Sequence, residues 1–359
     1  MVPKIEKSHM ATTRNSSIEL LRIICITIII MMHAITHNNC CDGVWGNILT
    51  AVGNCGVTTF ILISGYYGIS FNPKKIFHLR NIASFYLLIA LLFEIYTHRP
   101  VSGSNIFSVF FPIISGKYWF LTGYALLVIF SPYINSLLDS LSRNTLRILV
   151  LLLIFVFYFI PTFFKYDIPG NGGKNIICMT AVYVLGRYIA QTKIPEKTRN
   201  LPLIITFIVT ISIIILLDYL QQITGIKDYL LASHLIFQFD GDNSIFILIA
   251  SSSLFLFFSR THSHNKVINQ LAKSVFAAYI MEWFVRPFLL QYIDIPNISI
   301  SIQPLATITF AILVFLLCTA IDQLRLLTTY RLENGFEAFE CHLFNKAKAL
   351  TEKNLQRCP

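Results

Sequence analysis

The chain has 359 residues, of which 55% are hydrophobic and only 13% are charged, and its formal net charge at pH 7 is +10. Ordinary soluble proteins carry about 25% charged residues, so the composition excludes a soluble enzyme, a disordered chain, a collagen-like fibre and a disulfide scaffold. The remaining class is a multi-pass membrane protein, in which the few ionisable side chains inside apolar segments are the most informative residues.

Ten apolar segments are long enough to cross a bilayer, because a membrane-spanning helix needs about 20 mainly apolar residues. In chain order they lie at 17–37, 48–70, 77–97, 117–138, 145–164, 175–191, 201–219, 243–259, 267–292 and 299–321. These runs are too long and continuous for the alternating pattern of a β-barrel. The sequence therefore predicts an all-α transmembrane bundle of about ten spans over 17–321, between an N-terminal segment 1–16 and a tail 322–359.

Basic residues predict the orientation of this bundle. Most of the 28 Lys and Arg precede the first span, lie in the loops after the second, fourth, sixth and eighth spans, or follow the tenth span. Such an asymmetry places both termini in the cytoplasm of a multi-pass protein in the inner or plasma membrane. Because the positive charge is spread over many loops, it indicates a lipid bilayer as partner and no nucleic acid.

Two segments outside the spans have patterns of their own. The loop 220–242 surrounds an apolar run with charged residues, so it is either a re-entrant or interfacial piece or a simple connection. The tail has apolar residues at steps of three and four, a pattern typical of an amphipathic helix on the inner membrane surface: Phe336, Phe339, Leu343, Ala347 and Leu350.

The first span carries three ionisable side chains, Glu19, Arg22 and His33. Eleven residues at about 100° each return to the same helix face, so Arg22 and His33 share one face and lie about 16 Å apart along the axis. Glu19 precedes Arg22 by one turn and can pair with it. The spacing alone allows either a functional pair or a snorkelling Arg22 with a hydrogen-bonded structural His33.

This Arg-x10-His spacing, introduced by an acidic residue, resembles the acyltransferase 3 family of integral membrane acyltransferases. Further segments are similar to that family in the same order: the Phe-rich run ending in Ser64-Gly65-Tyr66, the basic stretch Lys74 to Arg80, the span entry Lys117-Tyr118-Trp119-Phe120-Leu121, and the helix segment from Ser274 through Tyr279 to Glu282. The chain departs from the family pattern at Glu282, where the family usually carries His.

The resemblance implies an enzyme that moves an acyl group, most often acetyl from acetyl-CoA, to a hydroxyl of a carbohydrate. The implied acceptors are surface polysaccharides, O-antigen or similar glycans at the outer face, and the implied donor is acetyl-CoA or another acyl-CoA from the cytoplasm. The family's essential Arg and His correspond to Arg22 and His33.

The chemistry of these residue types is compatible with that reaction. His33 can serve as the base that takes the hydroxyl proton, and guanidinium groups such as those of Arg22 and Arg80 match phosphate oxygens. Ser64 falls on the same side as the two arginines, which makes it a further donor-binding candidate. Arg80 could instead be a topology charge, and Ser64 could be a helix-packing contact.

Four residues are expected near the outer half, where the acceptor would arrive. Tyr118, Trp119 and Tyr279 are candidates for acceptor binding, although Tyr118 and Trp119 also suit an interfacial aromatic belt. Glu282 is a third catalytic candidate: it either pairs with Arg286 one turn later or orients His33, as a carboxylate orients a catalytic imidazole.

No metal is expected, because His33 and His37 have a metal-like spacing but no third ligand is evident. Two other classes of protein stay open. A transporter or flippase of a glycan or lipid-linked intermediate would use Arg22, His33 and Glu282 as relay groups, and a non-enzymatic membrane scaffold would use none of them. The Arg-x10-His spacing and its companion motifs favour the acyltransferase, since transport alone does not require them.

Overall fold

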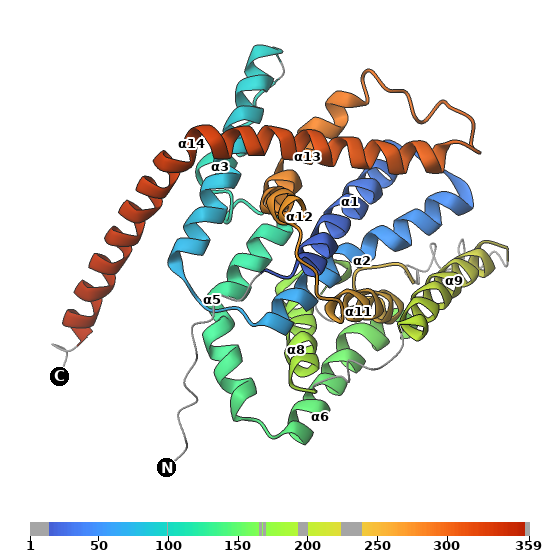
Figure 1. Ribbon diagram of the computed structural model, residues 1–359, viewed down its shortest axis with the longest axis horizontal. Helices are drawn as coiled ribbons and strands as arrows, with labels where there is room; N and C mark the ends of the chain where they lie inside the picture. The colour runs from blue at the N-terminus through green and yellow to red at the C-terminus, as the bar shows by residue number, and fades with distance from the viewer. Residues whose placement is uncertain are drawn as a thin grey trace.

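The computed structural model describes residues 14–98, 100–164, 167, 170–192, 200–223 and 239–355. Within these ranges the chain is helical and contains no strand, and helix occupies each of the ten predicted segments (Figure 1). Most of the loop 220–242 and of the segment 1–16 lies outside the described residues.

Among the residues that the structure describes, seven helical stretches are long and apolar enough to cross a membrane. Six are single helices: α1 (Ser16–Asn38), α2 (Gly43–Tyr67), α3 (Pro73–Tyr96), α5 (Trp119–Ser140), α9 (Leu201–Ile223) and α14 (Gln303–Leu355). The seventh is the continuous run of α6 (Arg143–Ile154), a π-helical turn (Phe155–Phe159) and α7 (Ile160–Phe164). The all-α multi-pass prediction is therefore confirmed.

Three of the predicted spans are occupied by shorter helices. These are α8 (Ile176–Thr192), α11 (Ile245–Ser259) and α13 (Val275–Leu289), with 17, 15 and 15 residues. A short helix α12 (Lys266–Leu271) and a 3-10 turn (Ala272–Ser274) precede α13. The structure also contains α4 (Gly103–Phe110), which the sequence did not predict. The total of ten spans stays a prediction.

Helix α1 lies inside the bundle and contacts α2, α11, α13 and α14. Its closest neighbour is α2, which approaches through two glycines. A Cβ atom added at Gly53 would lie 2.4 Å from the Cβ of Met32, and one at Gly56 would lie 2.6 Å from Cγ1 of Ile29. Because only glycine permits this approach, α2 forms a close wall beside the half of α1 that carries His33.

Gly65 allows a second close approach, between α2 and α8. An added Cβ would lie 2.3 Å from the carbonyl oxygen of Tyr183 and 3.0 Å from Cα of Gly186. Close packing of helices therefore accounts for the glycine of the Ser64-Gly65 motif, as the packing interpretation predicts.

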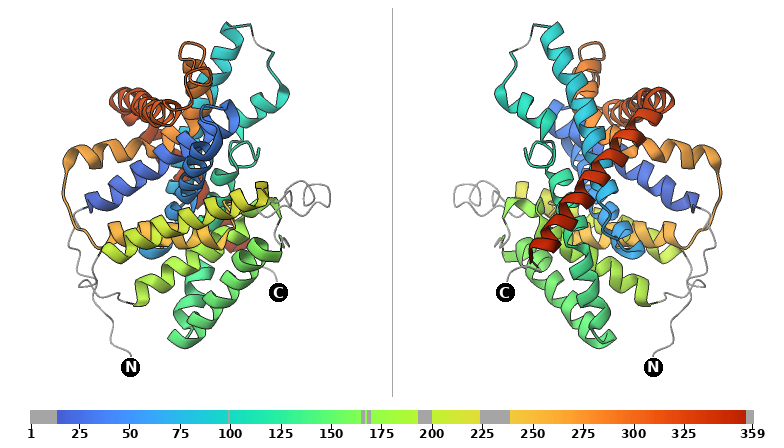
Figure 2. Two further views of the ribbon diagram at one scale, coloured as in Figure 1. Left: turned by 90° about the vertical axis from the view of Figure 1, so that its right-hand side faces the viewer. Right: turned by 90° about the vertical axis from the view of Figure 1, so that its left-hand side faces the viewer.

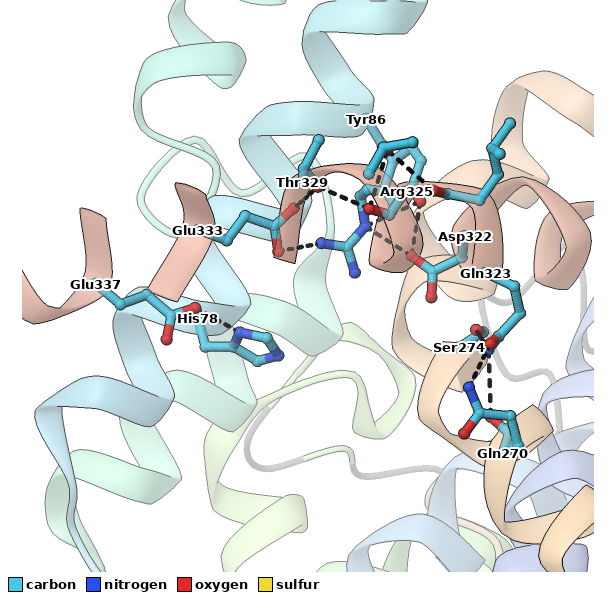
Figure 3. Close-up of polar contacts among 12 residues, drawn as sticks. His78, Tyr86, Gln270, Ser274, Asp322, Gln323, Arg325, Thr329, Glu333 and Glu337 are labelled. Carbon is cyan, nitrogen blue, oxygen red and sulfur yellow. Dashed lines mark hydrogen bonds and ion pairs between the residues drawn. The ribbon is translucent and has the colours of Figure 1, made fainter. Parts of the chain in front are cut away.

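The tail is a continuation of α14 and forms no separate helix. In Figure 1, α14 crosses the upper part of the view and then turns downward towards its last residues, and Figure 2 shows that it covers one flank of the bundle. The tail is tied to α3 through carboxylates: Glu337 accepts a hydrogen bond from His78 Nδ1 at 2.6 Å (Figure 3), and Glu340 pairs with Arg80. These contacts place one face of the tail against the chain itself.

Candidate active site

Four side chains at the His33 end of α1 form a buried polar cluster, named here the His33 cluster: His33, Asn38, Glu282 and Arg286. His33 Nδ1 lies 2.8 Å from Glu282 Oε1, and Arg286 Nε donates to Glu282 Oε2 at 2.9 Å. Arg286 also donates to Asn38 Oδ1. The side chains of Glu282 and Arg286 are 0% and 2% exposed, so two helices share a carboxylate that water does not reach.

The structure combines both interpretations of Glu282. One carboxylate oxygen contacts Arg286 one turn later on α13, and the other contacts His33 on α1. A buried carboxylate needs such partners, since an unpaired buried charge costs several kcal/mol. An ionised carboxylate only accepts hydrogen bonds, so Nδ1 of His33 carries the proton and donates to Glu282. In the neutral ring this leaves the lone pair on Nε2, where it can take up a proton.

Aromatic rings surround the imidazole of His33. Its ring centroid lies 4.9 Å from that of Trp283 and 5.6 Å from that of His37, and Arg286 lies 5.5 Å from the Trp283 ring. Within the part of the chain that the structure describes, no group of three His, Cys, Asp or Glu could hold a metal ion. Among the described residues, His33 thus forms a hydrogen bond with one carboxylate and packs against the rings of Trp283 and His37.

Two adjoining cavities lie along α1, one lined by Arg22 and the other by His33. The Arg22 cavity has a volume of about 300 Å³ and includes Arg22 and Ser64 in its lining. The His33 cavity is smaller, about 50 Å³, and His33, Tyr118 and Trp119 line it. Tyr279 lines both cavities. The structure therefore places Arg22 and His33 in neighbouring chambers on one side of α1, as their spacing predicts.

The Arg22 cavity carries a positive charge. Arg14, Arg22 and Lys273 line it together with Glu19, which lies 3.5 Å from Arg22 and 3.7 Å from Arg14. Three cations against one carboxylate leave an excess of two positive charges. A contact at the start of α1 helps to bring these three cations together. Ser16 Oγ donates to Asn269 Oδ1 of α12 at 2.8 Å and so holds α1 beside the segment that carries Lys273.

The other predicted residues have different surroundings. Tyr118 is buried and donates to the carbonyl oxygen of Ile280 at 3.1 Å, which does not fit a lipid-facing aromatic belt. Ser64 Oγ donates to the carbonyl oxygen of Phe60 within α2, at 3.0 Å. Arg80 is absent from the lining of the Arg22 cavity; its guanidinium donates to Asn81 and Glu340 instead. The structure thus separates Arg80 from the other donor-binding candidates.

Five charged residues that line the cavities were missing from the predicted site. Arg14 and Lys273 line the Arg22 cavity, and Lys117, Lys174 and Asp242 line the His33 cavity. Their positions near span ends gave only a signal for topology. Asp242 lies in the loop before α11, where burial raises its pKa to about 6, while Lys174 opposes that shift. Only the packing of distant segments brings these charges together.

A family model described as an acyltransferase domain, the acyltransferase 3 family, matches residues 15–322. The match covers the helices that carry both cavities and the His33 cluster. No curated protein and no solved structure matches the chain. With this match over most of its length and seven helices able to span a bilayer, the chain belongs to the acyltransferase 3 family and is a multi-pass membrane acyltransferase.

Proposed function

We propose that this protein transfers an acetyl group from acetyl-CoA to a hydroxyl of a cell-surface carbohydrate such as a polysaccharide or O-antigen. The observation that supports this most strongly is the His33–Glu282 hydrogen bond beside a cavity that adjoins a larger, positively charged one. A base and a site for an anionic donor are the two parts that acyl transfer from a CoA thioester requires.

The Arg22 cavity would bind the donor. Phosphate groups of acyl-CoA are anionic, and Arg14 and Arg22 offer guanidinium groups that match phosphate oxygens in bidentate fashion. Lys273 adds a third cation in the same lining. Ser64 lines this cavity as well and is a further donor contact. Arg80 is left out of the proposed donor site, because Asn81 and Glu340 hold its guanidinium.

The His33 cavity would hold the reacting hydroxyl, with Tyr118, Trp119 and Tyr279 as its aromatic walls. Nε2 of His33 takes the hydroxyl proton while the acceptor oxygen attacks the thioester carbonyl. The C–S bond then breaks, and the imidazolium returns the proton to the departing CoA thiolate. Glu282 stabilises the imidazolium between these steps, and Arg286 and Asn38 keep that carboxylate in place.

The two cavities would face opposite sides of the membrane. The basic loops predict that the Arg22 end of α1 faces the cytoplasm, where acyl-CoA is available, and that the His33 end faces outward, where a glycan would arrive. Both termini would then be cytoplasmic, and the protein would reside in the inner or plasma membrane. The proposed reaction uses no metal.

The test measures acyl transfer by the full-length protein in detergent or nanodiscs. Radiolabelled acetyl-CoA is supplied with and without glycan acceptors, and release of free CoA is followed in parallel, so that donor chemistry is detected even with a poor acceptor. Label should enter the glycan with the wild type and fall steeply with His33→Ala. The matched control is His37→Ala, one turn later on α1, which should keep activity within about tenfold.

Two results would contradict the proposal. Equal activity of His33→Ala and the wild type would show that His33 is not the general base. Movement of a glycan or lipid-linked intermediate across proteoliposomes without acyl incorporation or CoA release would favour the transporter interpretation, in which His33 and Glu282 serve as relay groups.

A further inference from the structure

Four side chains line both cavities and therefore form the boundary between them: Ile29, Val57, Phe120 and Tyr279. They come from α1, α2, α5 and α13 respectively, one from each helix. Any group that passes from the Arg22 cavity to the His33 cavity must pass this set of residues, named here the boundary ring.

Neighbouring rings hold the aromatic half of the boundary ring in place. The Phe120 and Tyr279 rings meet edge to face with centroids 5.7 Å apart. Behind them, Tyr118 lies 5.6 Å from Tyr279, and Tyr124 stacks on Phe120 at 5.8 Å. Such packing restricts the rotation of both rings, since each would have to displace a neighbour.

The aliphatic half is equally constrained. Ile29 is buried, and the backbone of α2 at Gly56 is so close that an added Cβ would lie 2.6 Å from Cγ1 of Ile29. Ile29 precedes His33 by one turn, about 6 Å along the helix axis. A thioester that presents its carbonyl to His33 therefore has its acyl chain at or just beyond the boundary ring.

The space beyond the boundary ring is small. A water-sized group needs about 10–15 Å³ measured in this way, so the His33 cavity of about 50 Å³ has room for roughly four such groups. An acetyl group contributes three non-hydrogen atoms and the acceptor hydroxyl a fourth. Butyryl would add two methylene groups, and succinyl would add one methylene group and a carboxylate.

We propose that the boundary ring and the small His33 cavity beyond it restrict the donor to short acyl chains, with acetyl preferred and butyryl and succinyl rejected. This specificity site rests on the proposed function. One additional methylene in a fitted pocket changes specificity by about 10- to 200-fold, so two should give a preference for acetyl over butyryl of about 100-fold or more.

The experiment measures kcat/KM of the full-length protein with acetyl-, propionyl-, butyryl- and succinyl-CoA, using one acceptor throughout. Phe120→Ala and, as a milder change, Val57→Ala should raise the butyryl-to-acetyl ratio by about tenfold or more, because each removes part of the boundary ring. The matched control is Phe60→Ala: Phe60 packs against Phe120 with centroids 6.4 Å apart but lines only the Arg22 cavity. Its butyryl-to-acetyl ratio should stay at the wild-type value.

The outcomes separate the two proposals. If the wild type transfers acetyl but uses butyryl-CoA equally well, the proposed specificity site is wrong and the proposed function is unaffected. The same holds if the butyryl-to-acetyl ratio in Phe120→Ala and Val57→Ala equals that of the wild type. A ratio that rises as much in Phe60→Ala as in Phe120→Ala also overturns the proposed specificity site. Absence of transfer from every acyl-CoA by the wild type overturns both.

Discussion

Two buried clusters in this bundle pair an arginine with a carboxylate one turn away on the same helix, and they differ in what completes the pair. In the His33 cluster, Glu282 and Arg286 of α13 meet His33. In the second, named here the Asp322 cluster (Tyr86, Asp322, Arg325 and Glu333), Arg325 Nε donates to Asp322 Oδ1 at 2.8 Å and Tyr86 donates to the same oxygen at 2.6 Å (Figure 3).

The two clusters also differ in their access to a cavity and in the partners of their carboxylates. His33 lines a cavity, whereas no member of the Asp322 cluster lines the Arg22 or the His33 cavity. Both oxygens of Glu282 have partners, while Asp322 Oδ2 has none among the described residues. Arg325 also reaches Glu333, eight residues later on α14. A buried ion pair by itself therefore indicates no function, and the His33 cluster differs from the Asp322 cluster in that its imidazole also lines a cavity.

The largest contrast is expected between His33 and Tyr86. His33→Ala should lower kcat/KM by about 10²- to 10⁴-fold, the range for loss of a general base, with a folded protein. Tyr86→Phe removes two buried hydrogen bonds, one to Asp322 and one from Arg325, and should lower the free energy of unfolding by about 1–3 kcal/mol without changing turnover per folded molecule. Labelled acetyl transfer per folded molecule measures turnover, and thermal unfolding measures the loss of stability. Loss of turnover in Tyr86→Phe would end the distinction between the clusters.

The next contrast concerns the two carboxylates. Glu282→Gln and Asp322→Asn each remove a charge partner of a buried arginine. The loss should cost about 3–5 kcal/mol of stability in Glu282→Gln and less in Asp322→Asn, because Arg325 keeps its ion pair with Glu333. Only Glu282→Gln should also shift the pH–rate profile, because only Glu282 holds the imidazole. The profile is measured at a temperature at which both variants stay folded. An unshifted profile in Glu282→Gln would reduce Glu282 to a structural role.

A smaller effect is expected from the cations of the Arg22 cavity. Lys273→Ala should raise KM for acetyl-CoA about tenfold and leave kcat unchanged, since a hydrogen bond to a charged group contributes about 1.5–3 kcal/mol, and an exposed lysine falls at the low end. Lys346→Ala, on the exposed tail, is the control and should change neither constant. Equal KM values for the two variants would contradict a donor site in this cavity.

The smallest effect concerns Asp242 at the His33 cavity. Its pKa in the folded protein, about 6, exceeds the ordinary value of 3.8, so the unfolded chain ionises first as pH rises. The folded state should therefore lose stability relative to Asp242→Asn between about pH 4 and pH 6, with Lys174, Asp240 and His33 as the titratable neighbours. Thermal midpoints of the two proteins across this range measure the difference. A constant difference would show that burial does not raise this pKa.

The sequence by itself determined the class of fold, because hydrophobic length and helical periodicity are local properties. The same periodicity placed Arg22 and His33 on one face of α1 and paired Glu282 with Arg286, and the spacing of the motifs was enough to indicate the family that matches residues 15–322.

Only the tertiary structure decided which charges meet across helices. Glu282 contacts His33 because α13 packs on α1, and Arg14 and Lys273 join Arg22 because the segment before α13 is held beside the start of α1. Arg80, which the motif grouped with the donor site, turns to Glu340 because the tail continues α14 along α3. The contacts between these helices join residues about 250 to 260 positions apart, and no local pattern encodes which faces of distant helices pack together.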